Sequence, residues 1–291
     1  MSSKSKPVIA ITAGDPAGIG PEIAEKAARN RAVTSACVPL IIGGAAGFIP
    51  SRPSPASGRA AVRFLDEALA LLADKKADAL VTAPAPKASF GKIGGHTEYL
   101  SKATGAKRVE MLMIAGGLRV LLLTRHIPLK DVSGEISVKK IADAAEQAGN
   151  YVRKYFLQNS RPPRIAVCGL NPHLSDGGLA GSEEKKIIAP AVEKLAEKGM
   201  CASGPLLAET VFGSGGKNFD LIVCMYHDQG MLPLKLIAPS KIVNLTIGLP
   251  FVRTSPGHGT AYDIAGKGIA DPRPMIEAVK LACRLVKNGR Q

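Results

Sequence analysis

The sequence predicts an α/β fold built on a mostly parallel sheet. Short apolar runs alternate with longer helical stretches along all 291 residues, and this alternation is typical of βαβ units. The 31 glycines and 21 prolines supply the tight turns that such connections need. A hydrophobic content of 46% is enough to bury the cores of one or two domains.

Seven short apolar runs, each bounded by turn residues, are predicted to be strands. In chain order they are Val8–Thr12, Val38–Ile42, Ala79–Thr82, Leu118–Thr124, Arg164–Cys168, Leu221–Met225 and Ile242–Thr246. Two of the five cysteines, Cys168 and Cys224, fall inside these runs, and the sequence has no C-x-x-C pair. We therefore expect reduced, buried thiols rather than disulfides.

Six stretches have helical periodicity. They are Pro21–Asn30, Ala60–Asp74, His96–Thr104, Ser137–Phe156, Glu183–Lys198 and Pro274–Asn288. Pro21 has the fixed φ that is wanted at the start of a helix, and Thr97 is available as a cap. Between two of the elements, Gly43–Gly58 is rich in Pro, Gly and Ser and is predicted to be a surface loop.

Composition argues against several classes of protein. No apolar run approaches the roughly 18 residues that span a bilayer, and the run behind the polar N-terminus, Met1 to Lys6, is too short for a signal peptide. We therefore expect a cytoplasmic protein without membrane contact. The net charge of +14 favours anionic partners, but the basic residues are dispersed and aromatics are only 4% with no Trp. Small anions are thus better candidates than nucleic acid.

Three histidines follow the carboxyl ends of predicted strands: His126, His173 and His227. Because the carboxyl ends of parallel strands line one edge of a sheet, these imidazoles are candidates for a shared divalent-metal site with a position open to substrate. Asp228 and Asp131 could orient the rings from outside. The alternative is three unrelated polar turn residues, since spacing alone does not establish convergence.

Several segments could bind anions. The loop Gly14–Glu22 offers backbone N–H groups, with tight-turn packing as an equal alternative, and it is neither a Walker loop nor a G-x-G-x-x-G fingerprint. His96 and Thr97 open a predicted helix and offer donors to a phosphate or carboxylate, although capping alone would also explain them. Arg253 suits bidentate binding of the same groups. Lys235 is either a cation of the site or a solvated surface lysine.

The segment Gly257–Gly268 contains four glycines around His258 and Asp263. Its backbone could wrap closely around a nucleotide. The alternative is a glycine loop with a purely structural role.

These segments together resemble the 4-hydroxythreonine-4-phosphate dehydrogenase family of vitamin B6 biosynthesis. The resemblance covers nearly the whole chain, with its motifs in the same order. They are T-A-G-D-P-A-G-I-G-P-E at 12–22, G-H-T-E at 95–98, H-I-P-L at 126–129, G-L-N-P-H at 169–173, Y-H-D-Q-G at 226–230 and N-L-T-I-G-L-P-F-V-R-T-S at 244–255.

The resemblance implies the isocitrate/isopropylmalate dehydrogenase type of α/β fold, with two α/β domains and the active site in the interdomain cleft. We expect residues 1–95 and 250–291 to form domain 1, with both termini and the nucleotide loop. Residues 96–249 would form domain 2, with the metal ligands and the dimerisation surface. The resemblance also implies a homodimer whose active site is completed across the interface.

The resemblance assigns roles to individual residues. The metal, zinc, magnesium or cobalt, would be held by His126, His173 and His227. Substrate-binding positions would be His96, Thr97, Lys235, Asn244 and Arg253. NAD or NADP would bind at Gly257, His258, Gly259, Ala261 and Asp263. Lys235 and Asp228 are the candidate catalytic residues.

The implied reaction is a metal-dependent oxidation of 4-phosphohydroxy-L-threonine by NAD(P). The resulting 3-keto acid then decarboxylates to 3-amino-2-oxopropyl phosphate. The chain departs from the family pattern at Ala83, Glu209 and Gly257 and in the shortened region 43–58. Other substrates therefore stay open, namely phosphorylated threonate or erythronate or a carboxylated cis-dihydrodiol, as does a non-catalytic ligand-binding role.

Overall fold

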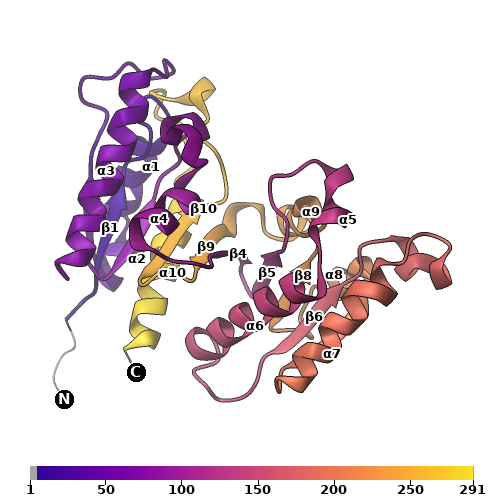
Figure 1. Cartoon of the computed structure of the whole chain (residues 1–291). Helices are drawn as coiled ribbons and strands as arrows, with labels where there is room; N and C mark the ends of the chain where they lie inside the picture. Colours follow the sequence, from indigo (N-terminus) through magenta and orange to yellow (C-terminus); the bar gives the residue numbers. More distant parts are fainter. Residues whose placement is uncertain (1–4, 291) are drawn as a thin grey trace. The chain divides into compact units, whose positions relative to one another are not determined.

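The computed structural model describes residues 5–290, which form two compact units (Figure 1). Unit 1 combines the chain up to Val109 with the chain from Val243 onward, and unit 2 is the continuous segment Glu110–Ile242. Most of the polar N-terminal stretch considered above, residues 1–4, lies outside the described residues.

The unit boundaries differ from those expected, because residues 96–109 and 243–249 belong to unit 1. Leu100, on α4 (His96–Thr104), is fully buried in the same apolar cluster as Leu65 and Leu80 of unit 1. On the other side, β9 (Ile242–Ile247) pairs antiparallel with β10 (Val252–Pro256) of that unit. His96, Thr97 and Asn244 therefore belong to unit 1, although the sequence placed them in domain 2.

The strands of unit 1 follow the order β2-β1-β3-β10-β9. The first four, β2 (Val38–Ile42), β1 (Val8–Thr12), β3 (Ala79–Thr82) and β10, run parallel, and β9 is antiparallel to β10.

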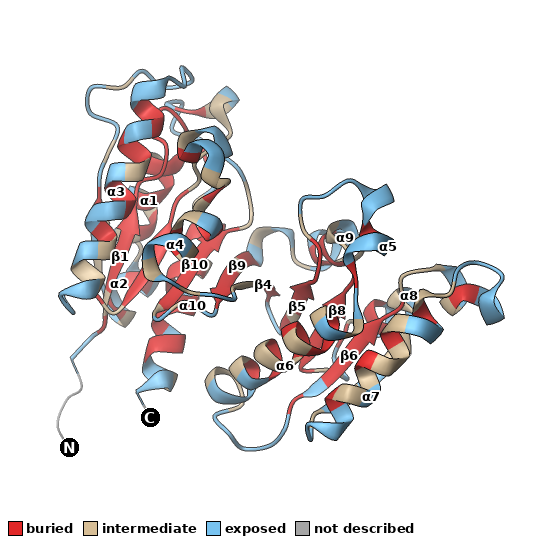
Figure 2. Cartoon of the chain, viewed as in Figure 1, coloured by how far each residue is buried: buried red, intermediate tan, exposed pale blue. Residues whose placement is uncertain are grey.

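Alternate residues of these strands face opposite helical layers. Ala10 and Leu80 pack on α3 (Pro55–Ala73) and α4. The opposite layer is α1 (Gly20–Ala28), α2 (Arg31–Ala36) and α10 (Arg273–Gly289), which contact one another. Because both faces are covered, β1, β3, β9 and β10 are buried almost throughout, whereas the edge strand β2 is only partly buried (Figure 2).

The strands of unit 2 follow the order β4-β5-β8-β6-β7. Antiparallel strands β4 (Glu110–Ala115) and β5 (Leu118–Leu122) are followed by the parallel strands β8 (Leu221–Cys224), β6 (Arg164–Cys168) and β7 (Cys201–Leu206). The helices of the unit are α5 (Val132–Glu135), α6 (Val138–Tyr155), α7 (Ala189–Glu197), α8 (Ala208–Gly213) and α9 (His227–Ile237). Its core includes Val120, Leu122 and Cys224 from the sheet and Met231 and Leu234 from α9.

Two helices begin at residues that the sequence analysis assigned to a loop or a turn. Helix α3 begins at Pro55, inside the predicted loop Gly43–Gly58, because Ser54 caps it: the Ser54 hydroxyl accepts a hydrogen bond from the Ser57 N–H. His227 was read as a turn residue but is the first residue of α9. This places its ring at a helix N-terminus.

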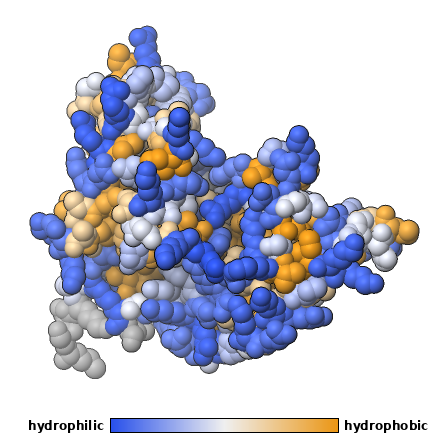
Figure 3. All heavy atoms as spheres, viewed as in Figure 1, coloured by the Kyte–Doolittle hydropathy of each residue, from blue (hydrophilic) through white to orange (hydrophobic). Residues whose placement is uncertain are grey.

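All five cysteines are free, as expected, and Cys168 and Cys224 are buried within their strands while Cys201 is exposed. On the face drawn in Figure 3, hydrophilic side chains cover most of the surface and hydrophobic ones form separate patches. No helix among the described residues is both long and apolar enough to cross a membrane.

Candidate active site

A buried cation lies on β10 of the unit 1 sheet, between β3 and β9. Arg253 on β10 is 2% exposed, and its guanidinium donates to the Thr246 hydroxyl on β9 at 2.8 Å and to the Thr82 hydroxyl at the end of β3 at 2.6 Å. Its Nε is buried without a hydrogen-bond partner. Within residues 5–290, no carboxylate forms an ion pair with Arg253. A buried guanidinium held only by neutral hydroxyls is prepared to take up an anion.

The imidazole of His96 is the neighbouring group. Helix α4 begins at His96, whose ring stacks at a tilt on Phe90 with centroids 4.7 Å apart. Desolvation, reinforced by the positive charge of Arg253, lowers the pKa of His96 from 6.5 to about 3. Desolvation also lowers the pKa of Arg253 from 12.5 to about 10, partly offset by the charge of Glu98. At neutral pH the pair is thus one cation beside one neutral imidazole.

Three threonines in or near this arrangement were not singled out from the sequence. Thr82 and Thr246 bind Arg253 directly, and Thr12 at the end of β1 carries a buried hydroxyl without a partner. Thr12 and Thr82 end their strands, so the strand-end rule that selected the histidines would also have found them. The expected residue Asn244 lies nearby on β9, opposite Ser255, and its side-chain oxygen is buried and unpartnered.

The cap of α4 is not Thr97, which is buried within the first turn. The cap position is Gly95, whose N–H donates to the Glu98 carboxylate at 3.0 Å. Capping therefore does not account for the polar side chains of His96 and Thr97.

The loop Gly14–Glu22 is closely packed and uses several of its backbone N–H groups within the protein. The N–H groups of Asp15, Ala17, Gly18 and Ile19 are all bound within the protein, the last of them to Thr260 O at 3.0 Å. None of these four groups is free to bind an anion.

The close packing of this loop also accounts for one departure in the sequence. A Cβ at Gly14 would meet Ala83 O at 2.8 Å, and one at Gly20 would meet the Ala83 Cβ at 3.3 Å. Gly20 therefore leaves space for the methyl group of the buried Ala83, whereas Gly14 lies against the Ala83 backbone.

The proposed nucleotide loop rests on the Gly14–Glu22 loop. Tyr262 donates from its hydroxyl to the Asp15 carboxylate at 2.8 Å, and burial with this contact raises the pKa of Tyr262 to about 12. Ala261 has the left-handed φ of 41°, and Gly259 faces open space. The Nε2 of His258 is buried without a hydrogen-bond partner. This orphaned donor or acceptor fits a loop that receives a polar ligand such as a nucleotide.

In unit 2 the structure brings two of the three candidate metal ligands together. The rings of His126 and His227 lie 5.8 Å apart between centroids. The Asp228 carboxylate is 2.7 Å from Nδ1 of His227, which leaves Nε2 of that ring for another partner. Asp131, the second expected orienting carboxylate, is exposed in the turn after His126.

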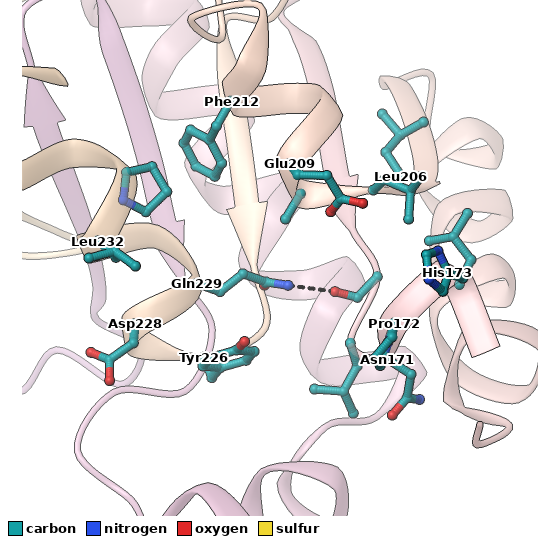
Figure 4. A pocket seen from close by; sticks show the side chains of 16 residues that line it. Asn171, Pro172, His173, Leu206, Glu209, Phe212, Tyr226, Asp228, Gln229 and Leu232 are labelled. Atoms are coloured by element: carbon teal, nitrogen blue, oxygen red, sulfur yellow. Dashed lines mark hydrogen bonds between the residues drawn. The ribbon is translucent and has the colours of Figure 1, made fainter. Parts of the chain in front are cut away.

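His173 does not join this pair in the structure. Among the described residues, no group of three His, Cys, Asp or Glu side chains comes together as a metal site. His173 instead lines a pocket of about 570 Å³ with Asn171, Glu209, Tyr226 and Asp228. Figure 4 shows Asp228 and Tyr226 on one side of this pocket and Asn171 and His173 on the other. The donor types suit a divalent metal: two imidazoles, His126 and His227, are adjacent, and the third, His173, lines a pocket whose lining includes Asp228, the neighbour of His227.

Most of the remaining expected residues are exposed. Lys235 lies on α9 and makes no ion pair in the part of the chain that the structure describes. Glu209, at the start of α8, reaches the pocket wall. Gly257 is half-buried and Asp263 is exposed in the proposed nucleotide loop.

Comparison with solved structures defines the class of protein. An isocitrate dehydrogenase from Methylococcus capsulatus superposes with a TM-score of 0.54 at 18% identity, covering 97% of this chain and 86% of that one. A 4-hydroxythreonine-4-phosphate dehydrogenase from Klebsiella pneumoniae superposes with a TM-score of 0.83 at 32% identity, covering 98% and 99%. The chain thus has the expected α/β fold of the isocitrate dehydrogenase type.

Sequence relatives define the family. The model of the pyridoxal phosphate biosynthetic protein PdxA matches residues 13–282, and the chain belongs to this family. A 4-hydroxythreonine-4-phosphate dehydrogenase from a Sulfurihydrogenibium species is 48% identical over 236 residues, 80% of this chain and 72% of the relative. A D-threonate 4-phosphate dehydrogenase from Cupriavidus necator is 39% identical over 326 aligned positions, 96% and 97%. The chain is a 4-hydroxythreonine-4-phosphate dehydrogenase-like enzyme.

Proposed function

We propose that this enzyme oxidises 4-phosphohydroxy-L-threonine with NAD or NADP, giving a 3-keto acid that decarboxylates to 3-amino-2-oxopropyl phosphate. The observation that carries the proposal is the buried Arg253, which has no carboxylate partner among the described residues and lies beside a neutral His96. Such a site needs an anionic ligand to complete its hydrogen bonding. A phosphorylated hydroxy acid provides that anion, and it is the substrate class that the names of the relatives carry.

In unit 1, we assign the binding and orientation of the substrate to the residues around Arg253. The guanidinium binds the substrate anion through its unpartnered Nε and the fork that Thr82 and Thr246 hold in place. His96 stays neutral and donates one N–H to the same anion, and Asn244 offers its unpartnered oxygen to a substrate hydroxyl or amine. The loop with His258, Gly259 and Ala261 receives the nucleotide.

In unit 2, the proposal assigns the metal to His126, His227 and His173. Asp228 fixes His227 with Nδ1 toward the carboxylate, so that Nε2 is the metal-binding atom. Bound metal and nicotinamide would supply polarisation of the reacting oxygen and acceptance of the hydride. Lys235 Nζ, which no ion pair occupies within the described chain, is assigned the transfer of the hydroxyl proton.

The decisive experiment measures NAD(P)H formation with a panel of four-carbon hydroxy acids, each with and without its phosphate, in the presence and absence of added zinc, magnesium or cobalt. We expect turnover only with phosphorylated acids and added metal. Equal turnover of acids with and without the phosphate, and equal turnover with and without added metal, would contradict the proposal. Lys235→Met should lower kcat strongly, whereas Lys241→Met, a nearby exposed lysine, should not.

A second candidate substrate is D-threonate 4-phosphate. The relative with this activity in its name is 39% identical and is matched over almost its full length. The two substrates share the phosphate and the secondary alcohol and differ by an amine and a hydroxyl. The ratio of kcat/KM for the two substrates in the same panel decides between them.

We further propose that the enzyme works as a homodimer. Leu232, Leu236 and Ile237 on α9 are 60%, 76% and 49% exposed, and adjacent large apolar side chains of this kind favour a protein interface. Sedimentation should show a dimer for the parent chain. Leu232→Asp with Leu236→Asp should shift it to the monomer, and a parent chain that sediments as a monomer would contradict the proposal.

A further inference from the structure

The turn that carries His173 has an unusual backbone. His173, Leu174, Ser175 and Asp176 have φ values of 50°, 58°, 70° and 43°, so four successive non-glycine residues are left-handed. Each such residue costs on the order of 1–2 kcal/mol relative to the right-handed conformation. A turn of this kind persists only where surrounding contacts hold it in place.

One buried carboxylate supplies those contacts. Glu184 is 4% exposed. Its Oε1 accepts from the N–H groups of Leu170 and Asn171, both at 2.7 Å. Its Oε2 accepts from the Asn171 amide at 3.0 Å and from the buried Ser175 hydroxyl. A single side chain therefore binds the backbone before His173 and the side chain of the second residue after it.

The fold holds this carboxylate rigidly. Glu184 opens the π-helical turn Glu184–Ile188, in which Ile188 is fully buried. A Cβ on Gly169, at the end of β6, would approach Glu184 Oε1 to 3.3 Å, so the carboxylate lies against the strand end. Its hydrogen bonds to the Asn171 N–H, the Ser175 hydroxyl and the Asn171 amide lower the pKa of Glu184 against the opposing effect of desolvation, which keeps it ionised.

We propose that Glu184 is a positioning residue, which holds the left-handed turn so that His173 presents its imidazole to the metal. This role rests on the proposed function, because it matters for catalysis only if His173 binds metal. Glu184 itself does not touch substrate or metal. It acts through the four donors that it binds on Leu170, Asn171 and Ser175.

The neighbouring Glu183 provides a matched control. Its carboxylate also accepts from the Asn171 amide, at 2.9 Å, but it is only half-buried and its other partners are Ser182 and Ser133, outside the turn. If any carboxylate near Asn171 were sufficient, Glu183→Gln and Glu184→Gln would have similar effects. If Glu184 sets the turn, only Glu184→Gln should matter, because its amide nitrogen would face two donors.

The test compares Glu184→Gln, Glu183→Gln and His173→Ala by zinc titration of the full-length protein and by hydrogen exchange of the amides from Leu170 to Ser175 without metal. We expect Glu184→Gln to weaken zinc binding about 10–100-fold, the range for groups that orient metal ligands. The same variant should speed exchange in the turn, and excess zinc should restore its kcat. Glu183→Gln should stay within about twofold of the parent in both measurements.

The outcomes separate this role from the proposed function. If His173→Ala weakens zinc binding but Glu184→Gln leaves zinc affinity or exchange unchanged, Glu184 does not position His173 and the inference falls while the metal site stands. If His173→Ala itself leaves zinc binding unchanged, the metal role of His173 fails and the positioning role fails with it.

Discussion

In the proposed anion site, Arg253 contributes the positive charge and the neighbouring His96 contributes a neutral N–H donor. A guanidinium and an imidazole that were both charged would repel one another within the same buried space. Desolvation and the charge of Arg253 keep His96 neutral, so the site holds one positive charge and still has an additional N–H donor. The arrangement also makes the stability of unit 1 depend on pH.

His96 should destabilise the fold in acid. Its folded pKa of about 3 lies below the ordinary 6.5. Between these values the unfolded chain therefore binds a proton that the folded protein does not. The free energy of unfolding should fall as pH is lowered from about 6.5 toward 3. Urea unfolding across this range should show a shallower decline for His96→Asn than for the parent. Parallel curves would contradict a His96 that stays neutral in the folded protein.

Arg253 should not be replaceable by lysine. A lysine keeps the charge but loses the planar fork that binds Thr82 and Thr246 and presents Nε to a ligand. We expect Arg253→Lys to lower kcat/KM for the phosphorylated substrate about 10–100-fold, the equivalent of one charged hydrogen bond. Arg273→Lys, at an exposed arginine that pairs with Asp271, is the control and should leave kcat/KM unchanged. If the two substitutions changed kcat/KM equally, Arg253 would not be the residue that binds the substrate anion.

At the scale of helices and strands, the sequence predicted elements whose apolar periodicity is uninterrupted. β1, β2, β3 and β6 have the predicted bounds. Three strands were missed. β10 reads V-R-T-S-P and is buried although polar, and β7 contains Gly204 and Pro205. β4, the hairpin partner of β5, lies outside every predicted element. Tertiary burial rather than local pattern decides these segments.

The candidate site, like the fold, was only partly predictable from the sequence. Strand ends selected His126, His173 and His227, because that rule needs only the strands. The fork around Arg253 was not predictable, since it requires knowing that β10 lies between β3 and β9. Helix α9 was missed because Gly230 and Pro233 lie inside it. Its glycine has a packing reason.

Gly230 should be required for the seating of α9. A Cβ there would lie 2.7 Å from Leu122 Cδ2 and 2.9 Å from Val120 Cγ1, both buried side chains of β5. Gly230→Ala should therefore lower the free energy of unfolding by about 1–3 kcal/mol and displace His227 at the helix start. Gly134→Ala, in α5 with nothing near its Cβ position, is the control and should be neutral or slightly stabilising. Chemical denaturation with zinc titration measures both effects.

At the scale of the whole molecule, the charge of +14 acts on anionic ligands from a distance. Since salt screens such attraction, with a Debye length of about 10 Å at 0.1 M, kcat/KM for a phosphorylated substrate should fall as ionic strength rises. The fall should be smaller for the same acid without its phosphate. Steady-state kinetics in increasing potassium chloride test this, and identical salt dependence for both substrates would contradict it.

Because β10 comes late in the sequence but pairs with the early strand β3, the sheet of unit 1 is completed late in synthesis. On the ribosome, β1, β2 and β3 emerge first, and all of unit 2 follows before β9 and β10 are synthesised. Until then, the side of β3 that will pair with β10 has no partner from unit 1, and an unpaired strand edge is prone to aggregation. Unit 2 is continuous and can complete its own core during this interval. The group of side chains around Arg253 is among the last parts of the enzyme to assemble, so a chain truncated before residue 252 would lack Arg253 and with it the proposed anion site.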